Sequence, residues 1–184
     1  MAISLGIIAS GIQKGSYESI ATVTVGSGGQ SSIAFTSIPG TYKHLQIRGI
    51  SRDLASAVEG NVKMTFNSDT TTTNYRMHSL IGNGSTASSQ DLGNAIPLSL
   101  TITGNTATAS AFGAGIIDIL DYASTNKYKT ARSLTGWDSN GDGRIMLRST
   151  LWLSTSAITS ITFTTNSGSN FAQHSRYALY GIKG

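Results

Sequence analysis

The chain has 184 residues, of which 12% are charged, and it carries a net charge of +4 with no cysteine. The absence of cysteine excludes disulfides, thiolate metal sites and thiol nucleophiles. The length suits one domain with an adequate core, and the scattered arginines and lysines lack the clustered basic stripe that is typical of nucleic-acid binding. We therefore expect a single folded domain with no nucleic-acid partner.

Residues 1–16 are apolar, punctuated by glycine and without a regular period. The apolar run is too short to span a bilayer, so we expect no transmembrane helix and no membrane partner. Because this segment has no obvious use inside an independent domain, we predict that residues 1–16 form an N-terminal extension that anchors the chain to neighbouring subunits. Residues 17–184 are predicted to form the one domain.

Regular alternation of side chains begins at Ser19–Val25, which we predict to be the first strand. The glycine-rich segment Gly26–Gln30 is typical of a turn. A second, returning strand is predicted at Ile33–Thr36, and a Pro-Gly turn signal follows it. We therefore predict that the first two strands of the domain pair as a β-hairpin.

Short alternating segments continue to the end of the chain. In Tyr42–Arg52, Leu45 and Ile47 fall on one face and polar side chains on the other, as in a half-buried strand. Further strands are predicted at Val62–Phe66, Tyr75–Ile81, Ile96–Ile102, Thr106–Phe112, Gly115–Tyr122, Tyr128–Trp137, Arg144–Leu153, Ile158–Thr165 and Ser175–Ile182. About ten to twelve short strands, with helix limited to a turn near Asp53–Glu59, predict an all-β, antiparallel sandwich or barrel.

Two segments are too polar to belong to a core, Asn67–Asn74 and Gly82–Gln90. Exposed loops are the usual place for variable contacts. We therefore predict that both segments are interaction loops, with candidate contact residues Asn67, Asp69, Asn74, Asn83 and Ser85.

The segment from Asp138 to Gly143 matches the first half of a calcium loop, with Asp138, Asn140 and Asp142 as candidate ligands. The second half does not match, because the twelfth position is Ser149 instead of a bidentate glutamate. The competing and favoured interpretation is a hairpin turn, since Asn, Asp and Gly adopt positive φ at little cost. We predict no bound metal and no cofactor.

No pattern in the sequence predicts a catalytic site. Asp118 and Asp121 are three residues apart, so they point to opposite faces of a regular strand, and we expect Asp118 to be half-buried beside an arginine. The three histidines lack metal-ligand spacing, and the serines include no nucleophile elbow. We therefore predict a protein that is not an enzyme and has no catalytic residues.

Aromatic side chains are the remaining candidates for a ligand surface. Flat aromatics suit a glycan-binding face, but Trp137 and Trp152 lie near strand ends, where aromatics usually fill a sandwich core. We expect both tryptophans in the core.

The segment Ala157–Asn166 mixes β-branched residues with hydroxyls and carries no charge. Ser and Thr together supply 50 of the 184 residues, so we expect a surface built largely from hydroxyl groups, which suits a durable shell better than an active site. Strict alternation fails between Ile158 and Ile161, which predicts a bend or bulge near Thr159-Ser160.

Several runs together resemble a group of structural proteins from tailed bacteriophages, especially phages of cyanobacteria and other aquatic bacteria. They span residues 17–183 in order. The matching runs are Tyr17–Val25, Ser37–Arg48, Phe66–Thr70 with Asn74-Tyr75, Gly82–Ser85, Ser154–Ile161 and Ala178–Lys183.

The resemblance implies an antiparallel β-sandwich of jelly-roll type, carried on the virion as a capsid decoration or cement protein, or as a tail or fibre component. It implies contacts with other virion proteins, namely the major capsid or tail protein, and a homo-oligomer, with a trimer favoured. It assigns no catalytic residues. The alternative function is a tail or fibre receptor-binding or carbohydrate-binding module with a glycan as partner.

Overall fold

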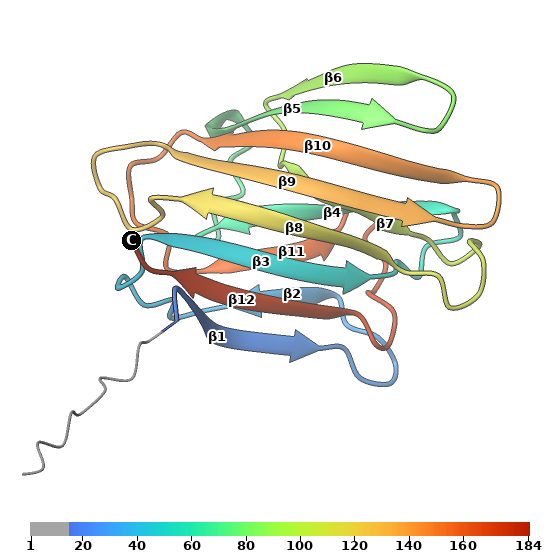
Figure 1. The fold of residues 1–184 in the computed structure, drawn as a ribbon, viewed down its shortest axis with the longest axis horizontal. Helices are drawn as coiled ribbons and strands as arrows, with labels where there is room; N and C mark the ends of the chain where they lie inside the picture. The colour runs from blue at the N-terminus through green and yellow to red at the C-terminus, as the bar shows by residue number, and fades with distance from the viewer. Residues whose placement is uncertain (1–14) are drawn as a thin grey trace, which may run out of the picture.

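The computed structural model describes residues 15–184, which form twelve antiparallel strands in two sheets (Figure 1). The large sheet has the order β1-β12-β3-β8-β9-β10-β5-β6, and the small sheet has the order β2-β11-β4-β7. The strands are β1 (Tyr17–Thr24), β2 (Ser32–Phe35), β3 (His44–Ser51), β4 (Glu59–Phe66), β5 (Tyr75–Gly82), β6 (Ala87–Gly93), β7 (Leu98–Thr103), β8 (Gly113–Leu120), β9 (Lys129–Asp138), β10 (Gly143–Trp152), β11 (Ile161–Thr165) and β12 (Arg176–Ile182). The predicted all-β, antiparallel sandwich is confirmed.

The first four strands alternate between the two sheets. The last two strands each insert between two of these first four. β12 lies between β1 and β3, while β11 lies between β2 and β4. The predicted opening hairpin is therefore wrong, because β1 pairs with β12 and β2 pairs with β11. The glycine-rich turn between β1 and β2 carries the chain from one sheet to the other, and Gly29 has a positive φ of 76° there. A Cβ at Gly29 would lie 2.7 Å from the carbonyl oxygen of Phe171, so this crossing requires glycine.

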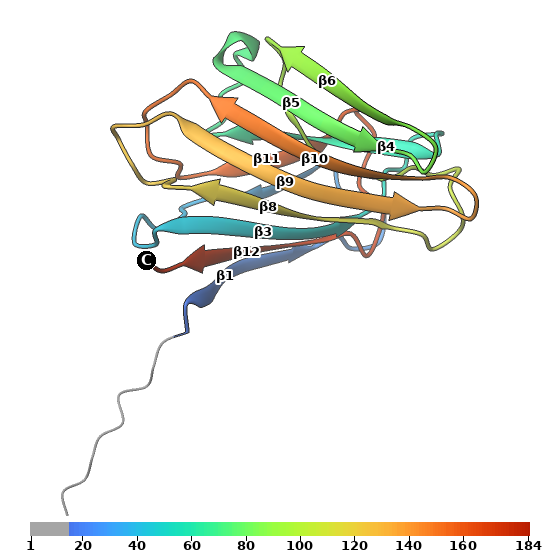
Figure 2. The same ribbon diagram turned by 45° about the horizontal axis from the view of Figure 1, so that its top comes forward.

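Two hairpins widen the large sheet beyond the small one. β9-β10 and β5-β6 add four strands next to β8, and Figure 2 shows β6 at the far edge of this extension. The side chains of β6 are almost all exposed, because no strand of the small sheet covers it. The large sheet therefore has an outer face that is wider than the sandwich core behind it.

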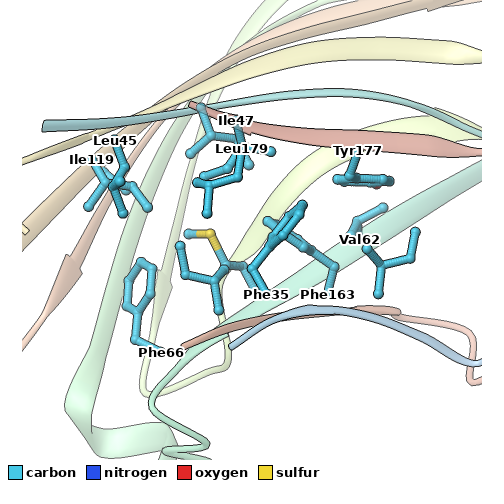
Figure 3. Close-up of a cluster of buried hydrophobic side chains, with 14 of the residues drawn as sticks. Phe35, Leu45, Ile47, Val62, Phe66, Ile119, Phe163, Tyr177 and Leu179 are labelled. Atoms are coloured by element: carbon cyan, nitrogen blue, oxygen red, sulfur yellow. The ribbon is translucent and has the colours of Figure 1, made fainter. Parts of the chain in front are cut away.

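The core lies between the two sheets and is aliphatic and aromatic (Figure 3). Leu45, Ile47 and Leu179 point inward from the large sheet and are fully buried. Phe163 from the small sheet meets Tyr177 from the large sheet with ring centroids 4.9 Å apart, which joins the two layers. Burial of each such side chain contributes about 1.5–3 kcal/mol.

Some predicted local structure is absent or shifted among the described residues. Residues 106–112 form a loop and not a strand, because the Arg52 guanidinium binds their carbonyl groups. The expected helical turn near Asp53–Glu59 is not present, and the helix that the structure does describe is the 3₁₀ turn Thr72–Asn74. Residues 87–90 belong to β6, so the predicted loop Gly82–Gln90 is shorter than expected.

The predicted bend or bulge near Thr159-Ser160 is not formed within a strand, because the predicted strand Ile158–Thr165 is shorter than expected and its pairing shows no register shift. β11 begins only at Ile161, and the Asn67 Oδ1 atom accepts hydrogen bonds from the backbone of Thr159 at 2.8 Å and of Ser160 at 3.1 Å. The residues before β11 are therefore held by a side chain instead of a strand ladder. The predicted anchor, residues 1–16, lies outside the described residues except for its last two.

Candidate interaction surface

The first predicted interaction loop uses its polar side chains inside the fold. Asn67 binds the segment before β11, as described above, and donates to the Ala157 carbonyl at 2.8 Å. Asp69 accepts hydrogen bonds from Trp152 Nε1 at 2.8 Å and Asn74 Nδ2 at 2.9 Å. Burial tends to raise the pKa of Asp69, but these bonds and those from Thr71 lower it to about 2. The polar groups of Asn67, Asp69 and Asn74 are thus largely occupied within the chain.

The second predicted loop lies at the opposite end of β5 from the first. Asn83 closes the β5-β6 turn, because its Oδ1 atom accepts from the backbone nitrogens of Ser85 at 3.0 Å and Thr86 at 2.8 Å. The eight residues of β5 separate the two loops by about 23 Å. The five candidate contact residues therefore do not form one site.

The segment from Asp138 to Gly143 is a two-residue hairpin turn between β9 and β10. Ser139 and Asp142 exchange backbone hydrogen bonds of 2.7 and 3.3 Å, with Asn140 and Gly141 at φ of 35° and 108°. These are the positive φ values that an Asn-Gly hairpin turn requires, so the turn interpretation is confirmed. Within residues 15–184, no group of three or more His, Cys, Asp or Glu side chains is arranged to hold a metal ion.

The two neighbouring aspartates have separate structural partners. Asp118 is half-buried, accepts a hydrogen bond from Gln46 Nε2 at 2.9 Å and lies opposite Arg132 in the β8-β9 pairing. Asp121 follows β8 and binds Lys127 Nζ at 2.6 Å and Lys43 Nζ at 3.0 Å. These two lysines, Lys127 first, lower the pKa of Asp121 to about 2, although burial opposes them. The arrangement is that of ion pairs at a strand end and not of an acid and base pair.

Both tryptophans are in the interior, as expected, with 3% of each side chain exposed. The strongly exposed aromatics are Tyr17 and Tyr128, at 51% and 55%. A glycan platform built on tryptophan is therefore excluded. The part of the chain that is described has no helix long and apolar enough to cross a membrane.

A row of large aliphatic side chains crosses the outer face of the large sheet, and sequence reasoning missed it. Ile116, Leu134, Leu147 and Leu80 are direct cross-strand neighbours on β8, β9, β10 and β5. Their exposed fractions are 41%, 53%, 51% and 57%. We call these four side chains the ridge. Contiguous exposed apolar patches are a common feature of protein interaction sites, so the ridge is a candidate interaction surface.

The next row along the same strands is unusually small. Ala114, Gly136, Ile145 and Gly82 are cross-strand neighbours there, and we call them the small row. Ala114 and Gly136 line a hollow of about 410 Å³ beside Ile116 and Leu134. Ridge and small row together make a grooved apolar surface.

Charged residues border this surface on both sides. Beyond the ridge, Asp118, Arg132 and His78 belong to one polar row. Beyond the small row, β9 ends with the exposed side chain of Asp138. An apolar centre with a polar rim is the usual anatomy of a protein interface.

One sequence signal points to the ridge. Ile145-Met146-Leu147 is apolar at three successive positions, so a strand here presents apolar groups on both faces. Met146 faces the interior, while Ile145 and Leu147 face solvent.

Comparison with known proteins adds no identification. No protein-family model, curated protein sequence or solved structure matches this chain.

Proposed function

We propose that this chain is a non-enzymatic structural protein of a tailed-bacteriophage virion, and that it acts as a capsid decoration or cement protein. The observation that carries the proposal is the ridge on the outer face of a rigid sandwich, since a shell protein works through such contact surfaces. Asn67, Asp69, Asn74 and Asn83 were predicted to form interaction loops, but their side chains are used within the fold, which leaves the ridge as the main candidate for function.

The strand order supports the proposal. β1-β12-β3-β8 and β2-β11-β4-β7 form two four-stranded layers, and without the two hairpins the chain changes layer at every step except from β4 to β7, which pair with each other. We interpret these eight strands as a jelly roll, an architecture common in capsid proteins, with β5-β6 and β9-β10 as insertions. The insertions build most of the ridge, so they add the contact surface to the basic sandwich.

The proposed partners are the major capsid or tail protein and other copies of this chain. The resemblance implies a trimer, which is the alternative to the two-fold pair proposed below. The apolar N-terminal residues, which include Ile3, Leu5 and Ile7, are proposed to anchor the chain to its neighbours. Deletion of residues 2–14 should leave a folded protein that no longer joins particles. Full incorporation of the shortened chain would contradict the anchoring role.

The function is tested with phage particles assembled without this chain. The purified full-length protein should bind such particles in co-sedimentation, should be located on the head by electron cryo-microscopy, and should raise the temperature at which the particles release DNA. A stoichiometric position on the tail would instead support the tail or fibre function. Failure to bind either head or tail would contradict a virion role.

Carbohydrate binding is the second candidate, and one exposed side chain favours it. Tyr128 has 55% of its side chain exposed and lies next to Lys127 in the loop before β9. A glycan array should then show saturable binding that Tyr128→Ala abolishes and Tyr128→Phe largely retains. Binding that is equal in all three proteins would exclude Tyr128 as the platform.

A further inference from the structure

We propose that the partner of the ridge is a second copy of this chain, packed face to face about a two-fold axis. The inference rests on the proposed assembly function and names the partner of its main contact surface. The axis lies in the plane of the interface, parallel to the ridge and midway between the ridge and the small row.

Rotation about this axis places the ridge of one copy over the small row of the other. Each residue then lies over the residue two positions along the same strand. Ile116 meets Ala114 of the second copy, and Leu134 meets Gly136. Leu80 likewise meets Gly82. Large side chains therefore face small ones on three of the four strands, which is the complementarity that close sheet packing requires.

The fourth strand, β10, is the exception to this pattern. Leu147 of one copy meets Ile145 of the other, and both are large and exposed. The two-fold axis makes this aliphatic pair twice, with large side chains facing small ones on the neighbouring strands β9 and β5. Because β9 and β10 are the middle two of the six strands from β3 to β6, the two pairs lie close to the centre of the contact.

Charge complementarity supports the same arrangement independently of the apolar residues. Arg132 lies on β9 two positions before Leu134, and Asp138 lies two positions after Gly136. The rotation that places Leu134 over Gly136 also places Arg132 over Asp138 of the second copy. Both side chains are exposed and of opposite charge, and the two-fold axis makes this pair twice.

The available area is adequate for a stable contact. Six strands from β3 to β6 at about 4.8 Å spacing and four side-chain rows at about 6.8 Å give roughly 780 Å² per copy. Stable interfaces bury about 800 Å² per partner. The aliphatic centre and charged rim thus fit a second copy in size as well as in shape.

The test is the oligomeric state of the purified full-length protein, measured by sedimentation equilibrium over a range of concentrations. We expect a reversible dimer. Leu134→Asp should raise the dimer dissociation constant at least a hundredfold, because it buries a charge at the centre. Leu120→Asp is the matched control, since Leu120 is exposed on the same face of β8 but lies outside the ridge, and it should change the constant less than threefold.

Gly136→Leu tests the hollow without removing an apolar group. A Cβ at Gly136 has its nearest contact at 3.5 Å, with the carbonyl oxygen of Arg144, so the monomer accommodates a side chain there. The larger residue should weaken the dimer as strongly as Leu134→Asp. Circular dichroism and tryptophan fluorescence verify that each variant is folded.

Charge reversal tests the orientation of the two copies. Arg132→Asp and Asp138→Arg should each weaken the dimer tenfold or more, while the double variant should recover at least half of the loss on a logarithmic scale. This two-fold arrangement would be overturned if Gly136→Leu left the dimer dissociation constant unchanged and the double charge-reversal variant recovered none of the lost affinity.

The remaining outcomes separate this inference from the proposed function. A protein that stays monomeric at all concentrations would overturn the pairing; this is the result expected if residues 1–14 cover the ridge. A trimer whose stability is unchanged by Leu134→Asp would also overturn it. A wild-type protein that binds particles but never dimerises would retain the virion function alone. A dimer with no affinity for particles would retain the pairing alone.

Discussion

At the scale of single residues, buried polar side chains hold the irregular parts of this chain in place. The Arg52 guanidinium donates to the carbonyls of Thr108 at 2.8 Å and of Asn105, Ala107 and Ala111 at 3.0 Å. One cation thereby satisfies four backbone acceptors that a strand would have paired with a neighbour. Only 8% of the arginine is exposed, so its loss would leave buried carbonyls without donors.

Replacement of Arg52 by methionine should lower the free energy of unfolding by about 3 kcal/mol or more, because several buried, charge-assisted hydrogen bonds are lost together. Hydrogen exchange should show the loss of protection first in residues 104–112. Arg176→Met is the control, since Arg176 is exposed on β12, and its effect should stay within about 0.5 kcal/mol. Equal effects of both changes in urea unfolding would contradict this role of Arg52.

Asp69 links the β4-β5 connection to the end of β10 through its bond to Trp152. Because the pKa of Asp69 is lowered to about 2 in the folded state, its contribution to stability is complete above the ordinary aspartate range. That contribution is lost as the pH falls from about 4 towards 2, because protonation removes the charge that the three donors share. Asp121, whose pKa is also lowered to about 2, acts in the same pH window.

Asp69→Asn should therefore destabilise the protein at pH 7 by about 1–3 kcal/mol and flatten the loss of stability between pH 4 and pH 2. Urea unfolding at several pH values measures both effects. Asp121→Asn should also reduce the loss of stability between pH 4 and pH 2, but it should leave the emission spectrum of Trp152 unchanged. An unaltered pH profile in the Asp69 variant would contradict the assignment.

At the scale of elements, the Asn140-Gly141 turn sets the register of β9 and β10 and thereby aligns Leu134 with Leu147 in the ridge. A Cβ at Gly141 would meet nothing within 4 Å, so the demand for glycine there is purely conformational. The resemblance of this segment to a calcium loop follows from the same residue types, because Asn, Asp and Gly serve both structures.

Gly141→Ala should lower the free energy of unfolding by about 1–2 kcal/mol, since alanine is strained at positive φ. Asn140→Gly is the matched control at the other central position, where glycine also suits the turn, and it should cost less. Thermal unfolding measures both, and a Gly141→Ala protein as stable as the wild type would show that the turn changes type.

At the scale of the whole molecule, the two sheets share one core, which includes Trp152, and Trp137 and Trp152 report on opposite ends of the large sheet. Trp137 lies at the β9-β10 turn, whereas Trp152 ends β10 at the other end of the sheet. The partner of β1 is the last strand, β12, so neither half of the chain completes a sheet alone. We expect one cooperative unfolding transition.

Trp137→Phe and Trp152→Phe each leave a single tryptophan and thus a probe at one end. In each variant, the fluorescence and far-ultraviolet circular dichroism transitions in urea should coincide. Separate midpoints within one variant would indicate that the β5-β6 and β9-β10 extension unfolds independently of the core sandwich.

Hydroxyl groups also occupy part of the interior, which differs from the expectation that they mainly build the surface. Ser133 and Thr135 of β9 and Thr150 of β10 are buried. Thr135 donates to the carbonyl of Thr101 at 2.8 Å, and Arg148 donates to Thr101 Oγ1 at 2.7 Å. Burial lowers the pKa of Arg148 to about 10, against the charge of Glu59, which raises it.

The sequence by itself determined the strand class, most strand positions, the buried tryptophans and the Asn-Gly turn, because these depend on local periodicity and turn chemistry. Only the tertiary structure decided the rest. It separated β1 from β2, made residues 106–112 a loop around Arg52, and directed Asn67 and Asp69 inward. It also aligned Ile116, Leu134, Leu147 and Leu80 in one row, since cross-strand register joins residues that are far apart in the chain and leaves no local pattern.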